Sequence, residues 1–293
     1  MGAPRPVGVI NLTDRVGTDA FTPGERRLVA AIASQIGAAI ENARLIDRDL
    51  QQQRVRRELE LAHDLQLRLL PRPAAVGLSA TIGARCEPAE SVGGDFYEFL
   101  RLAEGRVGVM LGDVSSHGFG AALIMALALS AAGIHASSAR SPEEALTRLL
   151  ASVAAELTRT EMHLAVFYGV VDSSRRRLHY ANAGHPHAFR VPASGAAERL
   201  GATSPPLGLA RSDAIVGAEV PWDARYDVLV LVSDGIVDAR NAAGERFGEP
   251  RLLEMVQQRR SDPPSAIVDA VFAAVTVHAP LATDDRTLLI FRS

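Results

Sequence analysis

The sequence predicts an α+β fold with antiparallel sheets, and three features of its 293 residues support this prediction. Six apolar segments rich in Val, Leu, Tyr and Phe have the length and composition of β-strands. Two of them are joined by a polar turn that opens at Asp172 and Ser173, as in a β-hairpin. Helices are expected in groups between the strands, which is typical of α+β domains. The predicted strands are residues 106–111, 164–172, 176–183, 187–191, 227–234 and 286–291.

The N-terminal region is expected to contain a strand and turn at residues 6–15, followed by a long helix. The helix starts at Thr22 and Pro23, because threonine is a good N-cap and proline is favoured in the first turn. Apolar residues then recur at steps of three or four and form one helix face. A strand and a helix alone cannot bury this face, so either the chain is cut from a longer protein or the face pairs with a second copy. The face consists of Leu28, Ile32, Ile36, Ala39, Ala43, Ile46 and Leu50.

Residues 51–70 are expected to continue as helix and carry a second apolar face. The step from Leu50 to Val55 is five residues, so the two faces are out of phase and predict a bend or a change of packing partner. Two interpretations of this helix stay open: a solvated linker with one packed face, or a dimerising coiled coil that carries a signal. Pro71 and Pro73 end the helix.

Three more helices are predicted in the rest of the chain. One follows Ser141, the expected N-cap, with Pro142 next and Glu144 completing a capping box. Another follows Asp262, an expected N-cap before two prolines. The third, residues 119–134, is apolar but shorter than the roughly 20 residues of a spanning helix. It is therefore expected to be a buried helix and not a membrane span.

Composition and charge exclude several classes of function. Apolar residues make up 47% and charged residues 22%, which is normal for a soluble globular protein. A net charge of −3 implies no broad attraction to nucleic acid or anionic lipid. The single Cys86 excludes an intrachain disulfide framework, and the N-terminus lacks the features of a secretory signal. We expect a cytoplasmic protein with no nucleic-acid or membrane partner.

Aspartates stand at the ends of several predicted strands, beside Gly, Ser or Thr. Each alone is explained as a turn residue, because Asp bonds nearby backbone amides. Together they can converge at one rim, where repulsion among carboxylates calls for a cation. Oxygen ligands suit Mg²⁺ or Mn²⁺, and two such ions activate a water and neutralise phosphate oxygens. Gly93, Gly94, Gly112 and Gly235 are expected to let backbone and substrate approach the ions. The aspartates are Asp95, Asp113, Asp234, Asp284 and Asp285.

Five motifs occur in order along the chain: "SVGGDFYEF", "GDVSSHG", "YANAGHP", "VSDGIVDARNAAGERFG" and "DDRTLLIF". Together they resemble the PPM-type metal-dependent protein Ser/Thr phosphatases, specifically the bacterial SpoIIE-type, RsbU-like branch that contains regulators of sigma-factor partner switching. The resemblance covers the chain from about Leu78 to its C-terminus. It implies an α-β-β-α sandwich, preceded here by the long N-terminal helix, with a dinuclear Mn²⁺ or Mg²⁺ site at one end.

The same resemblance assigns roles to individual residues. It implies that the nucleophile is a water bridged by two ions and that no phosphoenzyme forms. Asp113 and Asp95 are the candidate catalytic residues, and Asp285 falls where the family needs no ligand. The implied metal ligands are Asp113 bridging both ions, the Val114 carbonyl on one ion, Asp95 on the first ion directly or through water, and Asp234 with Asp284 on the second ion.

This chain departs from the family at Ser116, where a glycine is usual. If that position needs a positive φ, serine adds a strain of roughly 1 kcal/mol. His187 stands where such chains often continue with proline, and we expect this second departure to have no effect on the site.

Several other polar residues near the motifs have two interpretations. His117 and His185 can act as an acid or contact phosphate, or they fix the loop backbone. Arg240 and Arg286 can reach phosphate, or they are surface arginines. Cys86 can be proposed as a nucleophile, but no phosphate-cradling loop follows it, so a small buried hydrophobe is expected.

The expected domains are residues 1–46, 47–77 and 78–293. Residues 1–46 resemble the closing strand and last helix of a GAF sensor domain. Residues 47–77 resemble the regulatory linker helix of this branch, which by resemblance docks on the catalytic domain when upstream domains dimerise. A homodimer through the N-terminal helix is therefore expected.

The function implied is removal of phosphate from Ser or Thr of a protein, with a phosphorylated STAS-type anti-sigma-factor antagonist as the substrate. Three alternatives stay open: a catalytically silent module that binds a phosphoprotein, a dimeric scaffold or sensor in which the helix is the functional part, and a phosphoesterase for small molecules. Loss of a metal carboxylate is the sequence mark of the silent module, and all four are present.

Overall fold

The computed structural model describes residues 7–12, 21–72, 80–116, 118–209 and 215–293. The chain divides into two units, residues 1–61 and residues 62–293, and helix α1 (Pro23–Leu69) crosses the boundary between them.

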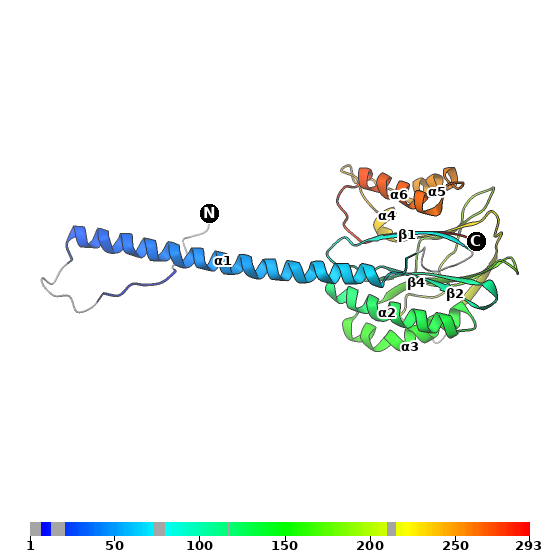
Figure 1. The fold of residues 1–293 in the computed structure, drawn as a ribbon, viewed down its shortest axis with the longest axis horizontal. Coiled ribbons are helices and arrows are strands. Elements are labelled where there is room, and N and C mark those ends of the chain that lie inside the picture. Colours follow the sequence, from blue (N-terminus) through cyan, green and yellow to red (C-terminus); the bar gives the residue numbers. More distant parts are fainter. Residues whose placement is uncertain (1–6, 13–20, 73–79, 117, 210–214) are drawn as a thin grey trace. The chain divides into compact units, whose positions relative to one another are not determined.

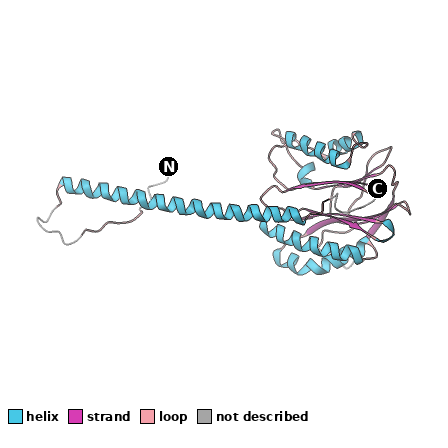
Figure 2. Cartoon of the chain, viewed as in Figure 1, coloured by secondary structure: helices cyan, strands magenta, loops and turns pink. Residues whose placement is uncertain are grey.

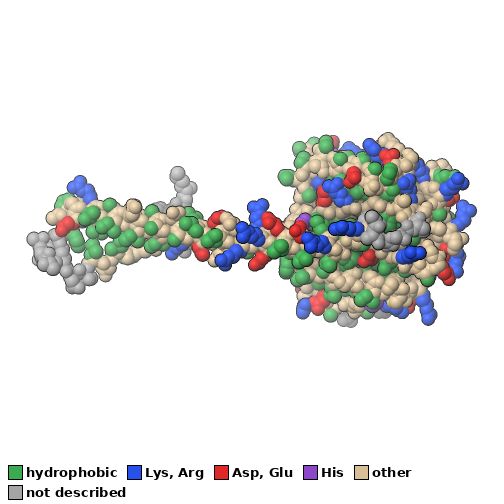
Figure 3. Space-filling view, in the orientation of Figure 1, with side chains coloured by type: hydrophobic (Ala, Val, Ile, Leu, Met, Phe, Trp, Pro, Cys, Tyr) green, Lys and Arg blue, Asp and Glu red, His purple; other side chains and the backbone are tan. Residues whose placement is uncertain are grey.

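The first unit consists mainly of helix α1. Thr22 caps it as expected: its Oγ1 accepts from the Glu25 backbone N–H at 3.2 Å, and the Glu25 carboxylate accepts from the Thr22 N–H at 2.7 Å. The helix runs without a break through Leu50 and Val55, so the phase shift changes only which side is apolar. Apolar side chains line the N-terminal half of α1 in Figure 3, and the predicted face is largely exposed in this single chain.

The strand expected at residues 6–15 is not found in its described part, because residues 7–12 have no regular structure. The other residues of that stretch lie outside the described residues, as does Pro73. Helix α1 ends at Leu69, two residues before Pro71.

The second unit is a four-layer sandwich, in which two antiparallel sheets lie between two layers of helices (Figures 1 and 2). Helices α2 and α3 cover one sheet, and α5 and α6 cover the other. The strand orders are β1-β10-β9-β6-β7 and β2-β3-β4-β5-β8, and every pair of neighbours is antiparallel. The predicted fold class and sandwich are therefore confirmed.

The six predicted strands are all present, and four further strands were not predicted. The strands are β1 Thr81–Glu87, β2 Phe96–Arg101, β3 Val107–Val114, β4 Leu164–Asp172, β5 Arg177–Ala183, β6 Ala188–Val191, β7 Glu198–Arg199, β8 Gly217–Pro221, β9 Val228–Val232 and β10 Arg286–Arg292. The helices of this unit are η2 Ala103–Gly105, α2 Phe119–Ser138, α3 Pro142–Thr160, α4 Asp234–Val237, α5 Glu249–Gln258 and α6 Pro264–His278.

The N-caps predicted from the sequence can be compared with the observed starts of α3 and α6. Ser141 caps α3 as predicted, accepting from the Glu144 N–H at 3.4 Å, while the Glu144 carboxylate accepts from the N–H of Arg140, one residue before the cap. The predicted cap at Asp262 is wrong by one residue, since α6 begins at Pro264 with Pro263 as N-cap. The reason is steric: a residue before proline is pushed out of the α region, and Pro263 has φ −55° and ψ 140°.

Helix α2 is longer than the sequence suggested. It has 20 residues and is long and apolar enough to cross a membrane by length and composition, although 44% of that stretch is buried inside the structure. Ala121, Met125 and Ala128 form part of its buried side, and the helix packs on α3 and β2. We interpret α2 as a core helix, in agreement with the buried helix expected there.

The core explains the run of four apolar residues, 288–291, in the middle of β10. Leu289 and Phe291 join the buried cluster between the two sheets, which extends under α2 and α3. Leu288 and Ile290 join a second cluster beneath α5 and α6. Successive side chains of a strand point to opposite faces, so a strand covered on both sides is continuously apolar.

Candidate metal centre

Strand register brings the predicted carboxylates to one end of the sandwich. Phe96 pairs with Gly112, which sets Asp95 beside Asp113. In the other sheet Leu288 pairs with Val232. Asp234 comes just after β9 and Asp284 just before the antiparallel β10, so both lie at the same end of this strand pair.

A cavity of about 370 Å³ opens at this end. Three of the four predicted carboxylates line it, together with the predicted carbonyl ligand Val114. His163, which the sequence analysis did not single out, also lines it. The full lining is Asp113, Val114, Ser115, Ser116, His163, Ala165, Asp234 and Asp284.

Asp95 lies behind this cavity and not on its wall. It follows Gly94 immediately before β2, and only 2% of its surface is exposed. Its Oδ2 atom is buried without a hydrogen-bond partner in the described part of the chain. A buried carboxylate oxygen without a donor is costly unless a cation or a proton satisfies it.

The carboxylates raise one another's pKa. Burial, followed by the negative charge of Asp113, holds the pKa of Asp95 well above its usual value. Burial and the charges of Asp234 and Asp284 raise the pKa of Asp113 to about 8. Burial and the charge of Asp284 also raise the pKa of Asp234. At neutral pH, the site therefore favours bound positive charge, either as protons or as metal ions.

The chemistry of these residues fits a hard divalent cation. The donors are carboxylate oxygens and one backbone carbonyl, the ligand types that Mg²⁺ and Mn²⁺ prefer. The residues share a site but do not form a ready-made cage: within the described ranges, no three His, Cys, Asp or Glu side chains converge closely enough to hold one ion.

Asp285, which was left out of the ligand set, braces the loop between β1 and β2, residues 88–95, which we call the Asp95 loop. Its Oδ2 accepts from the Gly94 N–H at 2.7 Å and its Oδ1 from the Ala89 N–H at 2.8 Å. Its backbone carbonyl accepts from the Ser233 hydroxyl at 2.9 Å, directly before Asp234. Asp285 thus ties β10 to both segments that carry carboxylates.

Asp285 is the close neighbour of two of the glycines. A Cβ at Gly93 would collide with the Asp285 carboxylate, and a Cβ at Gly235 would collide with the Asp285 backbone. Both glycines therefore make room for Asp285. At Gly112 the close neighbour is the Phe96 ring, and at Gly94 it is the Val114 carbonyl.

The strain expected at Ser116 is absent. Among the described residues, the non-glycine positions with positive φ are Glu104, Glu161 and Arg176. In this loop the positive φ falls at Gly118 instead, at 81°. The Ser116 N–H donates to the Val114 carbonyl at 2.6 Å, so that carbonyl has one lone pair left for an ion.

Of the two histidines proposed from sequence, His185 does not line the cavity. His117 lies outside the described residues. His185 is 2% exposed, and burial lowers its pKa to about 3. Its backbone N–H donates to Asn182 Oδ1 at 2.8 Å, and its carbonyl accepts from Asn182 Nδ2 at 2.8 Å. These two bonds use the backbone of His185 and the side chain of Asn182, so it is Asn182 that holds this loop; both ring nitrogens of His185 are buried without a hydrogen-bond partner among the described residues.

The other candidates have structural contacts. Arg286 is 4% exposed and donates to the Ala279 carbonyl at 2.7 Å. Arg240 donates to the Gly244 carbonyl at 2.7 Å within its own loop. Burial raises the pKa of Cys86, the reverse of what a thiolate nucleophile needs. His187 is not isolated, since its Nδ1 lies 2.6 Å from Glu249 Oε1.

The C-terminal end of α1 contacts the Asp95 loop through residues that the sequence did not reveal. Gln66 Nε2 donates to the Gly93 carbonyl at 2.6 Å, and Gln66 Oε1 accepts from the Gly93 N–H at 3.0 Å. His63 Nδ1 lies 2.8 Å from the Ser91 carbonyl. The one available signal was the polar Gln66 among leucines in "LQLRLL".

An α-β-β-α sandwich with aspartates gathered at one end of its two sheets defines a PP2C-type phosphatase domain. The family described as Stage II sporulation protein E (SpoIIE) matches residues 103–293, and the chain belongs to this family. Among solved structures, the SiaA PP2C domain of Pseudomonas aeruginosa has a TM-score of 0.72 and 25% identity, covering 83% of this chain and 98% of that one. The catalytic domain of the serine/threonine phosphatase PstP, solved with two manganese ions, shares the fold at a TM-score of 0.55 and 14% identity, covering 73% of this chain and 97% of that one.

Three curated relatives are similar in sequence. Protein IcfG of Synechocystis sp. is 29% identical over 68% of this chain, and the phosphoserine phosphatase RsbP of Bacillus subtilis is 30% identical over 62%. The phosphoserine phosphatase RsbU of B. subtilis is 25% identical over 82% of this chain and 71% of its own length. The chain spans only 35% of the length of IcfG and 46% of that of RsbP.

Proposed function

We propose that this chain is a Mn²⁺- or Mg²⁺-dependent phosphatase that hydrolyses phosphoserine or phosphothreonine on a regulatory protein. The observation that carries this proposal is the shared cavity of Asp113, Asp234 and Asp284, with the buried Asp95 behind it, whose Oδ2 has no hydrogen-bond partner among the described residues. The names of RsbP and RsbU as phosphoserine phosphatases support the reaction, and the two manganese ions of PstP support the cofactor.

Asp95, Asp113, Asp234, Asp284 and the Val114 carbonyl would hold two ions. Bound ions would supply an activated water and neutralise the charge of the phosphate. His163 also lines the cavity, where its imidazole would be available to contact the phosphate. Asp285 holds the Asp95 loop and the segment before Asp234 in place, because it accepts hydrogen bonds from the Gly94 N–H and the Ser233 hydroxyl.

The proposed substrate is a phosphorylated STAS-type anti-sigma-factor antagonist, as expected for the SpoIIE-type branch. The proposed organisation is a GAF-like fragment at residues 1–46, a linker helix at 47–77 and the phosphatase domain at 78–293. The exposed apolar face of α1, which includes Leu28 and Ile46 at 61% and 56% exposure, supports a homodimer through this helix.

The test is phosphate release from a phosphoserine STAS protein and from p-nitrophenyl phosphate, with Mn²⁺ or with EDTA. Release by the full chain should require Mn²⁺ and disappear in Asp113→Asn, while Asp269→Asn, an exposed aspartate on α6, should behave as wild type. Faster release from the phosphoprotein than from p-nitrophenyl phosphate would separate a protein phosphatase from a small-molecule phosphoesterase.

The catalytically silent alternative predicts no phosphate release under any condition, even though all four proposed metal carboxylates are present. A dimerising segment fused ahead of Glu41 distinguishes the two functions. Release that appears only with the forced dimer supports a regulated enzyme. No release under either condition, from a folded chain, supports a module that binds phosphoprotein without hydrolysis.

A further inference from the structure

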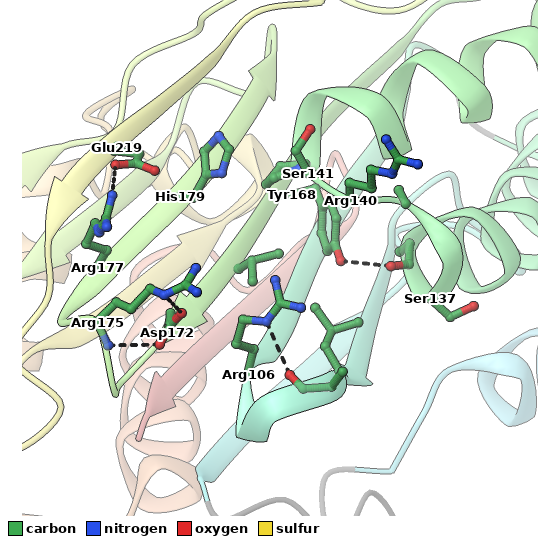
Figure 4. A pocket seen from close by; sticks show the side chains of 16 residues that line it. Arg106, Ser137, Arg140, Ser141, Tyr168, Asp172, Arg175, Arg177, His179 and Glu219 are labelled. Atoms are coloured by element: carbon green, nitrogen blue, oxygen red, sulfur yellow. Dashed lines mark hydrogen bonds and ion pairs between the residues drawn. The ribbon is translucent and has the colours of Figure 1, made fainter.

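A second cavity, of about 470 Å³, lies at the opposite end of the β2-β3-β4-β5-β8 sheet (Figure 4). Arg106 directly precedes β3 at this end, and Asp113 stands near the far end of the same strand. At about 3.3 Å per residue, the two positions are roughly 23 Å apart along the strand. The cavity is therefore separate from the candidate metal centre.

Connections from distant parts of the sequence build this cavity. The β2–β3 connection supplies Arg106, the last turn of α2 supplies Ser137, the α2–α3 connection supplies Arg140, and the β4–β5 hairpin supplies Arg175 and Arg177. Figure 4 shows these labelled side chains around Tyr168 of β4. The basic residues thus come together through the fold and not through a basic run in the sequence.

The charges in the cavity are unbalanced. Four arginines line it, against the two carboxylates Asp172 and Glu219. Arg177 pairs with Glu219 at 2.8 Å. Arg175 Nε lies 3.7 Å from Asp172 Oδ2, beyond hydrogen-bond range.

Arg106 and Arg140 have no carboxylate within ion-pair distance among the described residues. The Nε of Arg106 donates to the Ala103 carbonyl at 3.2 Å, which fixes the base of that guanidinium and leaves its two terminal nitrogens for a ligand. Two unpaired guanidinium groups at one cavity form a site for an anion, because each presents a fork of donors to oxygen atoms.

One hydroxyl group, that of Ser141, adds a donor to the same cavity. Ser141 Oγ accepts from the Glu144 N–H at 3.4 Å, so its own hydrogen is left to donate. Leu102 and Val170 provide an apolar wall. The volume falls in the range of small-molecule sites, about 300–1,000 Å³.

We propose that this cavity binds a small ligand through a phosphate group, held by Arg106 and Arg140. The proposal does not depend on the phosphatase activity. The phosphate can be free inorganic phosphate or the phosphate of a small ester, and the experiment separates these two sources.

The experiment is isothermal titration of inorganic phosphate, and separately of glycerol 3-phosphate, into the full chain in EDTA, which keeps metal ions out of the distant carboxylate site. Saturable binding at one site per chain is expected with at least one of the two. The double variant Arg106→Ala/Arg140→Ala should bind at least about tenfold more weakly, equivalent to about 1.4 kcal/mol. Arg159→Ala is the matched control, because it removes one exposed arginine from the end of α3, outside the cavity.

Two more variants keep the test decisive. Arg106→Lys/Arg140→Lys preserves charge but removes the forks, and weaker binding than wild type is expected. The single variant Arg106→Ala, checked by circular dichroism, serves if the double variant does not fold. Tighter binding of glycerol 3-phosphate identifies an ester as the ligand class, and equal or tighter binding of inorganic phosphate identifies the free ion. No saturable binding of either up to about 10 mM, or binding unchanged in folded arginine variants, overturns the proposal.

Discussion

Gln66 and Gly93 exchange two hydrogen bonds, at 2.6 and 3.0 Å, although 27 residues separate them in the sequence. Gln66 is 6% exposed near the C-terminal end of α1, and Gly93 stands two residues before Asp95. The side-chain amide of Gln66 therefore satisfies both the N–H and the carbonyl of Gly93, in the loop that carries the proposed metal ligand Asp95.

Replacing Gln66 with leucine should destabilise the second unit and weaken metal binding. The change leaves the Gly93 N–H and carbonyl buried without a partner, at a cost of about 1–3 kcal/mol for each group. Urea unfolding measures the first effect, and Mn²⁺ titration measures the second. Gln52→Leu, at an exposed position on α1, is the control. Equal stability and equal Mn²⁺ affinity of the two variants would contradict a role for the Gln66–Gly93 hydrogen bonds.

Asp113→Asn should stabilise the metal-free protein at neutral and higher pH. In the folded chain the pKa of Asp113 is raised to about 8, against about 3.9 in an unfolded chain. A raised carboxylate pKa means that the folded state binds the proton more tightly, so stability is greatest at low pH and is lost as pH rises toward about 8. Thermal melts in EDTA at pH 4 and pH 8 should show the variant gaining on wild type only at the higher pH.

A variant that melts below wild type at pH 8 would contradict this prediction. Asp269→Asn, exposed on α6, should show no such dependence on pH. The expected gain illustrates how a functional cluster of carboxylates can oppose stability until a cation binds.

His185 should give the opposite dependence on pH. Burial lowers its pKa to about 3, below the usual value of about 6.5. Its contribution is fully present above about pH 6.5 and is lost as pH falls toward 3, because the unfolded chain takes up the proton first. The stability of wild type relative to His185→Met should therefore fall across this interval, by up to about 1.4 kcal/mol per pH unit.

Chemical unfolding of both proteins between pH 7 and pH 4 measures this difference, in which the shared contributions of the carboxylates cancel. A difference that stays constant with pH would show that the imidazole is not held neutral. His135→Gln, at the Ser152 contact on α2, is the matched control.

Asp285→Ala should reduce both stability and Mn²⁺ affinity, even though Asp285 is not proposed as a ligand. The carboxylate accepts from the Gly94 and Ala89 N–H groups, and hydrogen bonds to a charged group contribute about 1.5–3 kcal/mol each. Calorimetric melting and Mn²⁺ titration report the two effects. If a folded Asp285→Ala variant bound Mn²⁺ as tightly as the wild type, the proposal that Asp285 holds the Asp95 loop in place for metal binding would be wrong.

The strands that the sequence predicted are those buried on both faces. β9 is apolar throughout and β10 carries four apolar residues in a row, because core clusters cover both sides. β1 and β2 were missed for the converse reason: β1, "TIGARCE", is partly exposed along its length, and β2 carries Glu98 and Arg101 among its six residues. Their pairing is supplied by β10 and β3, which no local pattern reveals.

The candidate site divides in a similar way. Asp95, Asp113, Asp234 and Asp284 were identified because each ends or precedes a strand in a recognisable motif. The contacts of Asp285 and Gln66 were not, because their partners are 191 and 27 residues away and any polar side chain in those positions reads as a turn or a surface residue. The collisions that fix Gly93 and Gly235 likewise depend on Asp285 folding back between them.

The most direct measurement is the number of Mn²⁺ ions bound by the full chain and by Asp113→Asn, counted by electron paramagnetic resonance of free Mn²⁺. We predict two ions per wild-type chain, with binding largely lost in Asp113→Asn because that carboxylate is proposed to bridge both. Wild-type binding in a folded Asp113→Asn variant, or no binding by the wild-type chain and by its forced dimer, would contradict a metal centre at these strand ends.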